Sequence, residues 1–212
     1  MPRKTERRHI QGDTSRQRIL EAALEIAAER GYDGTSVALV TEKTGLPASS
    51  IYWHFKNKDQ LLAEALDFSY RRWREVGPPW QADLEPLPLA SQVQNRFRQA
   101  AAAYVAQPEF WRLGLMLALE QRVKEPAARV RFIQVRRESM TVLTDWWGRV
   151  LASSFDVVNP AAPATLARFH LAALDGLFVA TQADRKVDVA WVVDTLAGGL
   201  SVAASRLAAA RS

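Results

Sequence analysis

Apolar residues recur at helical spacing along almost the whole chain, whereas runs of alternating β-branched residues, which are typical of strands, are nearly absent. Breaks rich in glycine and proline interrupt the pattern, and the two largest lie at residues 77–88 and 159–163. The sequence therefore predicts an all-α protein. Its nine expected helices span residues 14–30, 35–44, 47–55, 58–75, 89–106, 108–123, 126–154, 164–183 and 188–210.

The composition is that of a globular protein without thiol chemistry. Of the 212 residues, 48% are hydrophobic and 24% are charged, and there is no cysteine, which excludes disulfides and thiolate metal sites. No stretch of 18 apolar residues is free of charge, and no apolar run follows the basic N-terminus. We therefore expect a cytoplasmic protein that has no membrane partner.

Sequence motifs of enzymes are missing. The chain has no phosphate-binding glycine loop, no HExxH motif and no nucleophile elbow, and its three histidines lie far apart in the sequence. We expect no catalytic residue, no metal and no cofactor.

Three segments are expected along the chain. Residues 1–12 form a basic arm, residues 13–67 a small helical domain, and residues 68–212 a larger helical domain. In the first helix, Ile19, Leu20 and Ala23 begin an apolar stripe that Ile26 and Ala27 continue. Gly31 then ends this helix at a position that favours left-handed backbone.

The most informative segment is TSVALVTEKTGLPASSIYWHFKNK, residues 35–58. Two short helices joined by a turn at Gly45 are the sequence form of a helix-turn-helix, whose second helix enters the major groove of DNA. Pro47 presets the first turn of that second helix without capping it, and Asn57 can cap the helix that follows. The core would take Val37, Val40, Ile51 and Phe55, while the outward residues would be Ala48, Ser49, Ser50, Trp53 and His54.

Positive charge is concentrated around this motif. Residues 1–67 carry ten basic and ten acidic side chains, but residues 43–58 carry three basic and no acidic ones. The segment from Arg3 to Arg18 adds six basic residues against two acidic ones. Concentrated positive charge is what contact with DNA phosphates requires.

The segment from about Ser15 to Leu66 resembles the DNA-binding domain of TetR-type transcriptional regulators. ILEAALEIAAERGYDGTSV and IYWHFKNKDQLLAEAL carry the resemblance, with Gly45, Tyr52, Phe55 and Lys58 at the spacings of that family. It implies a homodimeric regulator that binds an inverted-repeat, double-stranded DNA operator and is released by a small, largely apolar effector. It also implies that Thr35, Ser36 and Lys58 contact phosphates, that Ala48, Ser49 and Ser50 face base edges, and that Tyr52, Trp53 and His54 grip the backbone and groove wall.

Other interpretations of these residues stay open at this point. Tyr52 and Trp53 could instead pack in the core, and His54 could be an ordinary surface histidine. The arm could enter a minor groove or merely aid solubility. The competing functions are a DNA-binding activator or architectural protein without an effector, and a helical protein-interaction module.

The larger domain is rich in aromatic residues, which could fill a helical core or line an effector cavity of the kind that the resemblance implies. The candidates for the ligand site are Trp111, Trp147, His170 and Asp175. The last two helices carry apolar residues on more than one side and contain the pair Gly198–Gly199, which suggests close approach of a second subunit. The candidates for the dimer interface are Phe169, Leu177, Leu196, Leu200 and Ala203, and packing within one chain is the alternative.

Overall fold

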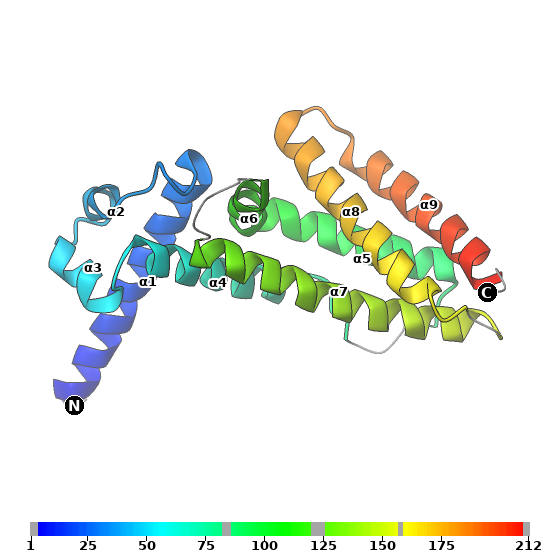
Figure 1. Ribbon diagram of the computed structural model, residues 1–212, viewed down its shortest axis with the longest axis horizontal. Coiled ribbons are helices and arrows are strands. Elements are labelled where there is room, and N and C mark those ends of the chain that lie inside the picture. Colours follow the sequence, from blue (N-terminus) through cyan, green and yellow to red (C-terminus); the bar gives the residue numbers. More distant parts are fainter. Residues whose placement is uncertain (1–3, 82–85, 120–125, 157–158, 210–212) are drawn as a thin grey trace. The chain divides into compact units, whose positions relative to one another are not determined.

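The computed structural model describes residues 4–81, 86–119, 126–156 and 159–209, with side chains described from residue 14 to residue 208 within these ranges. These segments form α-helices and no strand, so the all-α prediction is confirmed for the part described (Figure 1). The helices are α1 (Lys4–Arg30), α2 (Val37–Thr44), α3 (Ala48–His54), α4 (Lys58–Val76), α5 (Leu89–Ala106), α6 (Glu109–Leu119), α7 (Ala127–Ser154), α8 (Ala162–Ala183) and α9 (Val189–Ala209).

Most helix bounds agree with the predictions to within two residues, but α1 begins at Lys4 instead of Thr14. The segment expected to be an arm is therefore largely helical. The expected ends of two helices, residues 120–123 and residue 210, lie outside the described residues.

Two compact units make up the chain. The first contains residues 1–73 and 107–134, and the second contains residues 74–106 and 135–212. Helices α4 and α7 each contribute residues to both units. This division differs from the expected boundary at residue 67, because α6 and the start of α7 belong to the same unit as residues 13–67.

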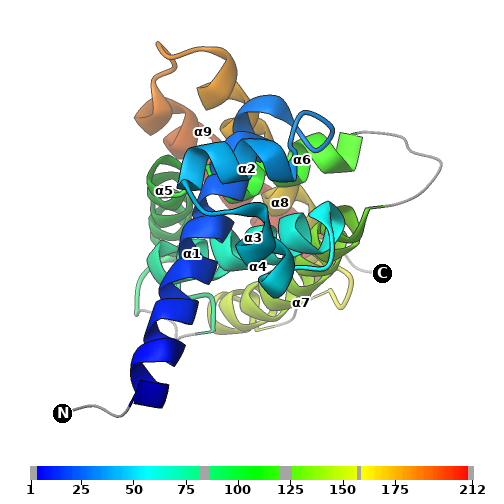
Figure 2. The same cartoon turned by 90° about the vertical axis from the view of Figure 1, so that its left-hand side faces the viewer.

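The first unit is built on the apolar stripe of α1. Ile19, Leu20 and Ala23 are buried there, as the periodicity predicts, and α2 and α3 pack against α1 (Figure 2). A second part of the core is aromatic and joins α4, α6 and α7. Its ring contacts link Tyr70, Trp73, Phe110, Trp111 and Phe132.

The close packing of α6 against α7 explains Gly114. A β-carbon at this position would lie 2.1 Å from a ring carbon of Phe132, which is far inside van der Waals contact. Glycine is therefore the residue that lets α6 approach the start of α7.

In the second unit, α5, α8 and α9 pack against one another (Figure 1). An aromatic cluster, which we call the His170 cluster, lies in its core. It consists of Trp80, Phe97, Trp146, Trp147 and His170. No helix within the described ranges is long and apolar enough to cross a membrane.

Candidate nucleic-acid interface

The start of α2 is fixed by its cap. Ser36 has extended backbone, and its hydroxyl oxygen accepts a hydrogen bond from the backbone N–H of Leu39 at 3.2 Å. This is the N-cap geometry that the sequence predicts. A hydroxyl that accepts one bond can still donate its proton, so Ser36 remains suited to a phosphate contact.

The turn between α2 and α3 has the predicted glycine conformation. Gly45 has φ of +68°, and its N–H donates to the Thr41 carbonyl at 2.9 Å. The Thr44 hydroxyl accepts from Leu46 N–H, while the Thr44 carbonyl accepts from the Arg18 guanidinium at 2.8 Å. These bonds hold α3 at a defined angle to α2 and α1.

Helix α3 presents one face to the core and the other to solvent. Ile51 and the following Phe55 are buried, whereas Tyr52 is 56% exposed and Trp53 is 75% exposed. Core packing is therefore excluded for these two aromatic residues in the single chain. Ala48 and Ser49 are also exposed, and Ser50 and His54 are half-buried. The Trp53 and His54 rings meet edge to face, with centroids 4.5 Å apart.

Hydrogen bonds between side chains and nearby backbone N–H groups fix the start of α4. The Asn57 side chain accepts from Gln60 N–H at 2.8 Å, and the Gln60 side chain accepts from Lys56 N–H at 2.9 Å. Asn57 is thus the predicted cap. Lys56 itself is exposed beside the end of α3. It was not among the predicted contact residues, although it belongs to the basic run that signals phosphate binding.

The structure holds Lys58 in place through Tyr32. The Lys58 ammonium donates to the Tyr32 carbonyl at 3.1 Å and lies 4.5 Å from the centroid of its ring. The Tyr32 hydroxyl donates to Asp59 Oδ1, and the same oxygen accepts from the backbone N–H of Ala127 at 2.8 Å. Tyr32 is a positioning residue that sequence reasoning did not single out.

Thr35 does not fit the phosphate contact expected of it. Its side chain is buried, and its hydroxyl donates to the Gly31 carbonyl at 2.8 Å. It stabilises the turn that follows α1, so the exposed surface around α3 does not include it.

Part of the basic charge near the motif is already paired. Lys43 forms a 2.7 Å ion pair with Glu25, whose hydrogen bond and negative charge raise the pKa of Lys43. Arg16 pairs with Glu64. Fewer positive charges are therefore available around α3 than the sequence count suggests. Those that remain centre on Lys56 and Lys58.

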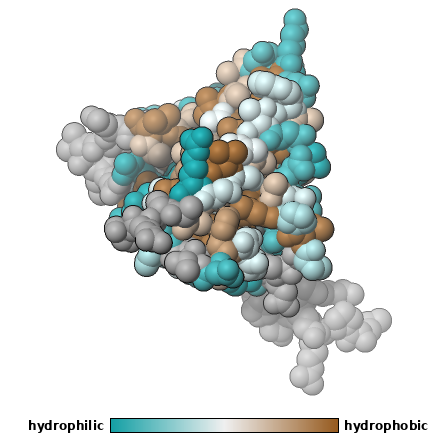
Figure 3. All heavy atoms as spheres, turned by 90° about the vertical axis from the view of Figure 1, so that its right-hand side faces the viewer, coloured by the Kyte–Doolittle hydropathy of each residue, from teal (hydrophilic) through white to brown (hydrophobic). Residues whose placement is uncertain are grey.

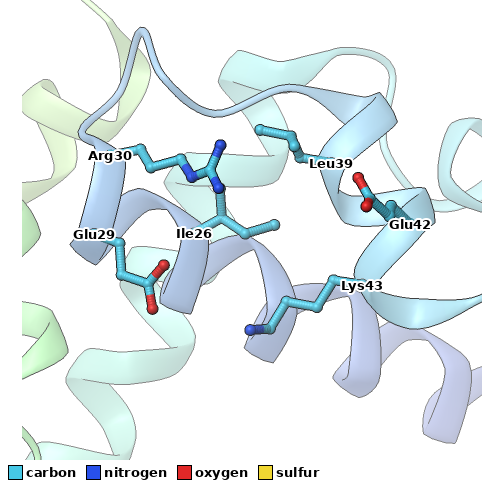
Figure 4. A pocket seen from close by; sticks show the side chains of 6 residues that line it. All are labelled: Ile26, Glu29, Arg30, Leu39, Glu42 and Lys43. Carbon is cyan, nitrogen blue, oxygen red and sulfur yellow. The ribbon is translucent and has the colours of Figure 1, made fainter.

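A hollow of about 350 Å³ lies between α1 and α2 (Figure 4). Its lining mixes apolar, acidic and basic side chains, namely Ile26, Glu29, Arg30, Leu39, Glu42 and Lys43. Because acidic and basic groups face the same space, the hollow has no clear preference for an anion, and it is not part of the candidate DNA surface.

Comparison with known proteins agrees with this geometry. Residues 19–65 match the family described as "Bacterial regulatory proteins, tetR family". The segment that contains α2 and α3 is therefore similar to this family.

Two curated relatives match the N-terminal part. The HTH-type transcriptional regulator AcrR of Shigella flexneri is 32% identical over 90 residues, which is 42% of this chain and 40% of that protein. The tetracycline repressor protein class D of Escherichia coli is 40% identical over 95 residues, 42% of this chain and 41% of that protein. The matches thus span about two fifths of these relatives' own length.

The likeness of fold extends further than the likeness of sequence. A TetR-family transcriptional regulator from Agrobacterium tumefaciens superposes with a TM-score of 0.71 at 17% identity, covering 93% of this chain and 100% of that one. The fold of most of this chain is therefore similar to that of a solved TetR-family regulator.

The four candidates for the ligand site are not brought together in the structure. Trp147 and His170 lie in the same cluster, with ring centroids 6.0 Å apart. Asp175 is held by Arg136 in a two-point ion pair of 2.9 and 2.6 Å. Trp111 belongs to the aromatic core of the first unit, where it contacts Trp73, Phe110 and Phe132. Sequence periodicity could not separate these environments, because it indicates that a side chain faces the interior but not which residues of other helices it contacts.

Burial decides the charge state of two of the buried groups in the second unit. Removal from water lowers the pKa of His170 to about 3, so the imidazole is neutral at pH 7. Burial also raises the pKa of Tyr104, and the negative charge of Asp175 adds to that shift.

The five residues proposed for the dimer interface differ in how far they are buried in the second unit. Phe169 is exposed and Leu196 and Ala203 are half-buried, but Leu177 and Leu200 are buried within the single chain. The last two therefore pack inside the unit, contrary to expectation, because the helices bury one apolar side and expose another. On α8 and α9, sequence analysis missed three large apolar residues that are exposed: Val179, Trp191 and Val202.

Glycine accompanies these exposed residues. Gly176, Gly198 and Gly199 are exposed, and a β-carbon added at any of them would meet nothing within 4 Å. Figure 3, viewed from the side on which α9 ends, shows hydrophobic patches between hydrophilic residues. The outer face of α8 and α9 therefore combines apolar side chains with glycines that leave room for a close neighbour.

Proposed function

We propose that this chain is a transcriptional repressor that binds an inverted-repeat operator as a homodimer and is released from it by a small ligand. The observation that carries the proposal is the exposed face of α3, where Tyr52 and Trp53 stand out from a helix whose other face is buried. Exposed aromatic residues on a short, rigidly held helix are costly for a free protein and useful at a macromolecular contact.

The proposed contacts divide by their position on the motif. Ala48, Ser49 and Ser50 begin α3 and are short enough to approach base edges in the major groove. Tyr52, Trp53 and His54 follow them and are proposed to contact the sugar-phosphate backbone.

Phosphate contacts are proposed at the starts of the neighbouring helices. Ser36 caps α2, and Lys58 begins α4, where the helix dipole also favours an anion. We add Lys56 to this set because it is exposed and adjoins Lys58 in sequence. The release of counterions by such lysines is the usual source of affinity for DNA.

A second copy of the chain is the proposed partner of the outer face of α8 and α9. Phe169, Val179 and Val202 are each about half exposed in the single chain, with exposed fractions of 46%, 54% and 53%. Burial of these side chains favours association, and the glycines permit close approach of the partner's backbone. A two-fold dimer would present two copies of α3 to an inverted repeat.

Repression and ligand release are proposed from the relatives and from the second unit. One relative is named a tetracycline repressor, so that protein represses. The second unit of this chain holds a buried aromatic cluster with polar groups, which is the kind of core that can take a small ligand. Because the proposed operator is DNA inside the cell, we propose a cytoplasmic location for the protein.

The decisive experiment selects bound sequences from a pool of random DNA duplexes with the full-length protein. The expected product is an inverted repeat whose half-sites are centred about 34–36 Å apart, or somewhat more, with protection of both halves. Replacing Trp53 with Ala should abolish selection while the helix content stays unchanged. Selection of no sequence, together with no shift of any duplex at low salt, would reject the DNA-binding proposal and favour a protein-interaction module.

A further inference from the structure

The His170 cluster contains polar atoms that the protein leaves without partners. Among the described residues, Nδ1 and Nε2 of His170, Nε1 of Trp146 and Nε1 of Trp147 make no hydrogen bond. All three side chains are fully buried. Buried polar atoms are nearly always bonded, because an unbonded one keeps the whole cost of losing its water. Several such atoms in one cluster point to a missing partner.

One residue of the His170 cluster, Trp80, differs from the others in its secondary structure. Phe97, Trp146, Trp147 and His170 lie on helices, whereas Trp80 lies outside any helix, between α4 and α5. Its ring centroid is 5.2 Å from that of His170 and 5.4 Å from that of Trp146. Two hydrogen bonds hold the Trp80 backbone rather than its ring: the carbonyl accepts from the Arg149 guanidinium at 2.6 Å, and the N–H donates to the Pro78 carbonyl at 2.9 Å. Trp80 is therefore the ring that can leave with the least disturbance of the helices.

The unpartnered atoms define what would satisfy them. An indole N–H can only donate, and a neutral imidazole donates from one nitrogen and accepts at the other. The cluster thus offers the two indole N–H groups and one imidazole N–H, against one accepting nitrogen. A partner for this set must be mainly a hydrogen-bond acceptor, and its remaining surface must be apolar to match the rings.

The charges nearby argue against an ionic ligand. A carboxylate would need a cation, but Arg136 already holds Asp175 through both of its terminal nitrogens, and Arg149 is bonded to Trp80. A cation could stack on the aromatic rings, yet it would leave the indole donors without acceptors.

We propose that the His170 cluster binds a neutral, ring-sized molecule carrying a carbonyl-type acceptor, which takes the place of the Trp80 ring and bonds to His170, Trp146 or Trp147. The proposal deepens the ligand-released function above and rests on it, because it names the chemical class of the releasing ligand. Binding would displace the Trp80 ring, while Arg149 keeps its hydrogen bond to the Trp80 carbonyl.

Two probe molecules test the acceptor directly. Acetophenone carries a carbonyl oxygen, and α-methylstyrene has the same shape with a methylene group in place of that oxygen. By calorimetry on the full-length protein, acetophenone should bind on the order of tenfold more tightly, the difference expected for one buried hydrogen bond. Equal affinities, or no binding of acetophenone at millimolar concentration to the wild type and Trp80→Ala alike, would overturn the proposal.

Variants locate the site. Trp80→Ala should tighten the binding of both probes by a similar factor, because the ring that occupies the site is gone. His170→Phe and Trp147→Phe should each reduce the preference for acetophenone while α-methylstyrene still binds. The matched control is Trp73→Phe, which changes a buried indole of the first unit and should keep the full preference. Retention of that preference in both His170→Phe and Trp147→Phe would place the site elsewhere and reject the proposal.

Charged probes and DNA complete the test. Tighter binding of benzoate or of phenyltrimethylammonium than of acetophenone would overturn the neutral-ligand assignment. A gel shift with the selected operator separates the two proposals. If acetophenone binds with the expected preference but does not change operator affinity, the assigned site stands and ligand-released repression fails.

Discussion

At the scale of single residues, His170 makes stability depend on pH. Its pKa is about 3 in the folded chain and 6.5 when unfolded, so the unfolded chain binds a proton that the folded chain excludes. The stabilising effect of keeping His170 neutral is complete above pH 6.5 and is lost as pH falls towards 3, by about 1.4 kcal/mol per pH unit.

The predicted consequence is seen by comparing wild type with His170→Phe in urea unfolding at pH 7 and pH 5. The wild type should lose about 2 kcal/mol more than the variant over this interval. Trp73→Phe, which replaces a buried aromatic side chain of the first unit, is the control and should show the same pH dependence as the wild type. Parallel losses in wild type and His170→Phe would show that His170 is not held neutral by burial.

Lys58 and Lys43 provide a matched pair for DNA binding. Lys58 is held beside Tyr32 at the start of α4, whereas Lys43 pairs with Glu25. Lys58→Ala should weaken binding to specific and random duplexes by similar factors and lower the salt slope by about 0.9 per lost phosphate contact. Lys43→Ala should leave the slope unchanged. Equal slopes for wild type and Lys58→Ala in a salt titration would remove Lys58 from the contact surface.

At the scale of helices, replacing either of two glycines with alanine should change the free energy of unfolding, but in opposite directions. Neither Gly45 nor Gly148 has an atom within 4 Å of an added β-carbon, but Gly45 has φ of +68° and Gly148 lies inside α7. Gly45→Ala should destabilise by roughly 1–2 kcal/mol, because an L-residue is strained in left-handed backbone. Gly148→Ala should stabilise by roughly 1 kcal/mol. Urea unfolding measures both, and a stabilising Gly45→Ala would contradict the turn geometry.

The helices were largely predictable because their ends depend on local chemistry. Gly31 and Gly45 adopt the left-handed backbone that ends a helix, and Asn57 and Ser36 cap the helices that follow them. The start of α1 was placed wrongly. Residues 1–12 were expected to form an arm because they are polar and basic, but α1 includes most of them, and the one glycine among them, Gly12, costs the helix only about 1 kcal/mol.

At the scale of the molecule, the structure revises how the proposed dimer should be tested. Leu200 is fully buried in one chain, whereas Val202 on the same helix is 53% exposed. Val202→Glu should therefore give a monomer of normal helix content with weak operator binding, because a charge enters the apolar contact twice. Leu200→Glu should instead unfold the second unit. Sedimentation and circular dichroism distinguish these results, and a dimeric Val202→Glu would contradict the proposed face.

Sequence alone could not distinguish buried from exposed apolar side chains in the second unit. The last two helices are apolar on two sides, so Leu177 and Phe169 looked equivalent although one is buried and the other is exposed. Trp111 and Trp147 looked like members of one site because the sequence does not show which helices pack together, whereas they belong to different units. The surface of α3 was easier to predict, because its polar and apolar positions alternate with the period of a helix.

The glycine pair of α9 has a consequence for how the sequence can evolve. Alanine at Gly198 and Gly199 would meet no atom of the chain itself and would raise helix stability by roughly 1 kcal/mol each. A mutant library screened only for heat resistance of the lone chain should therefore lose both glycines quickly. A library screened for repression in the cell should keep them, because the β-carbons would fill the space that a second chain needs. The rates of substitution at these two positions in the two libraries would show whether helix stability or contact with a second chain determines the sequence of α9.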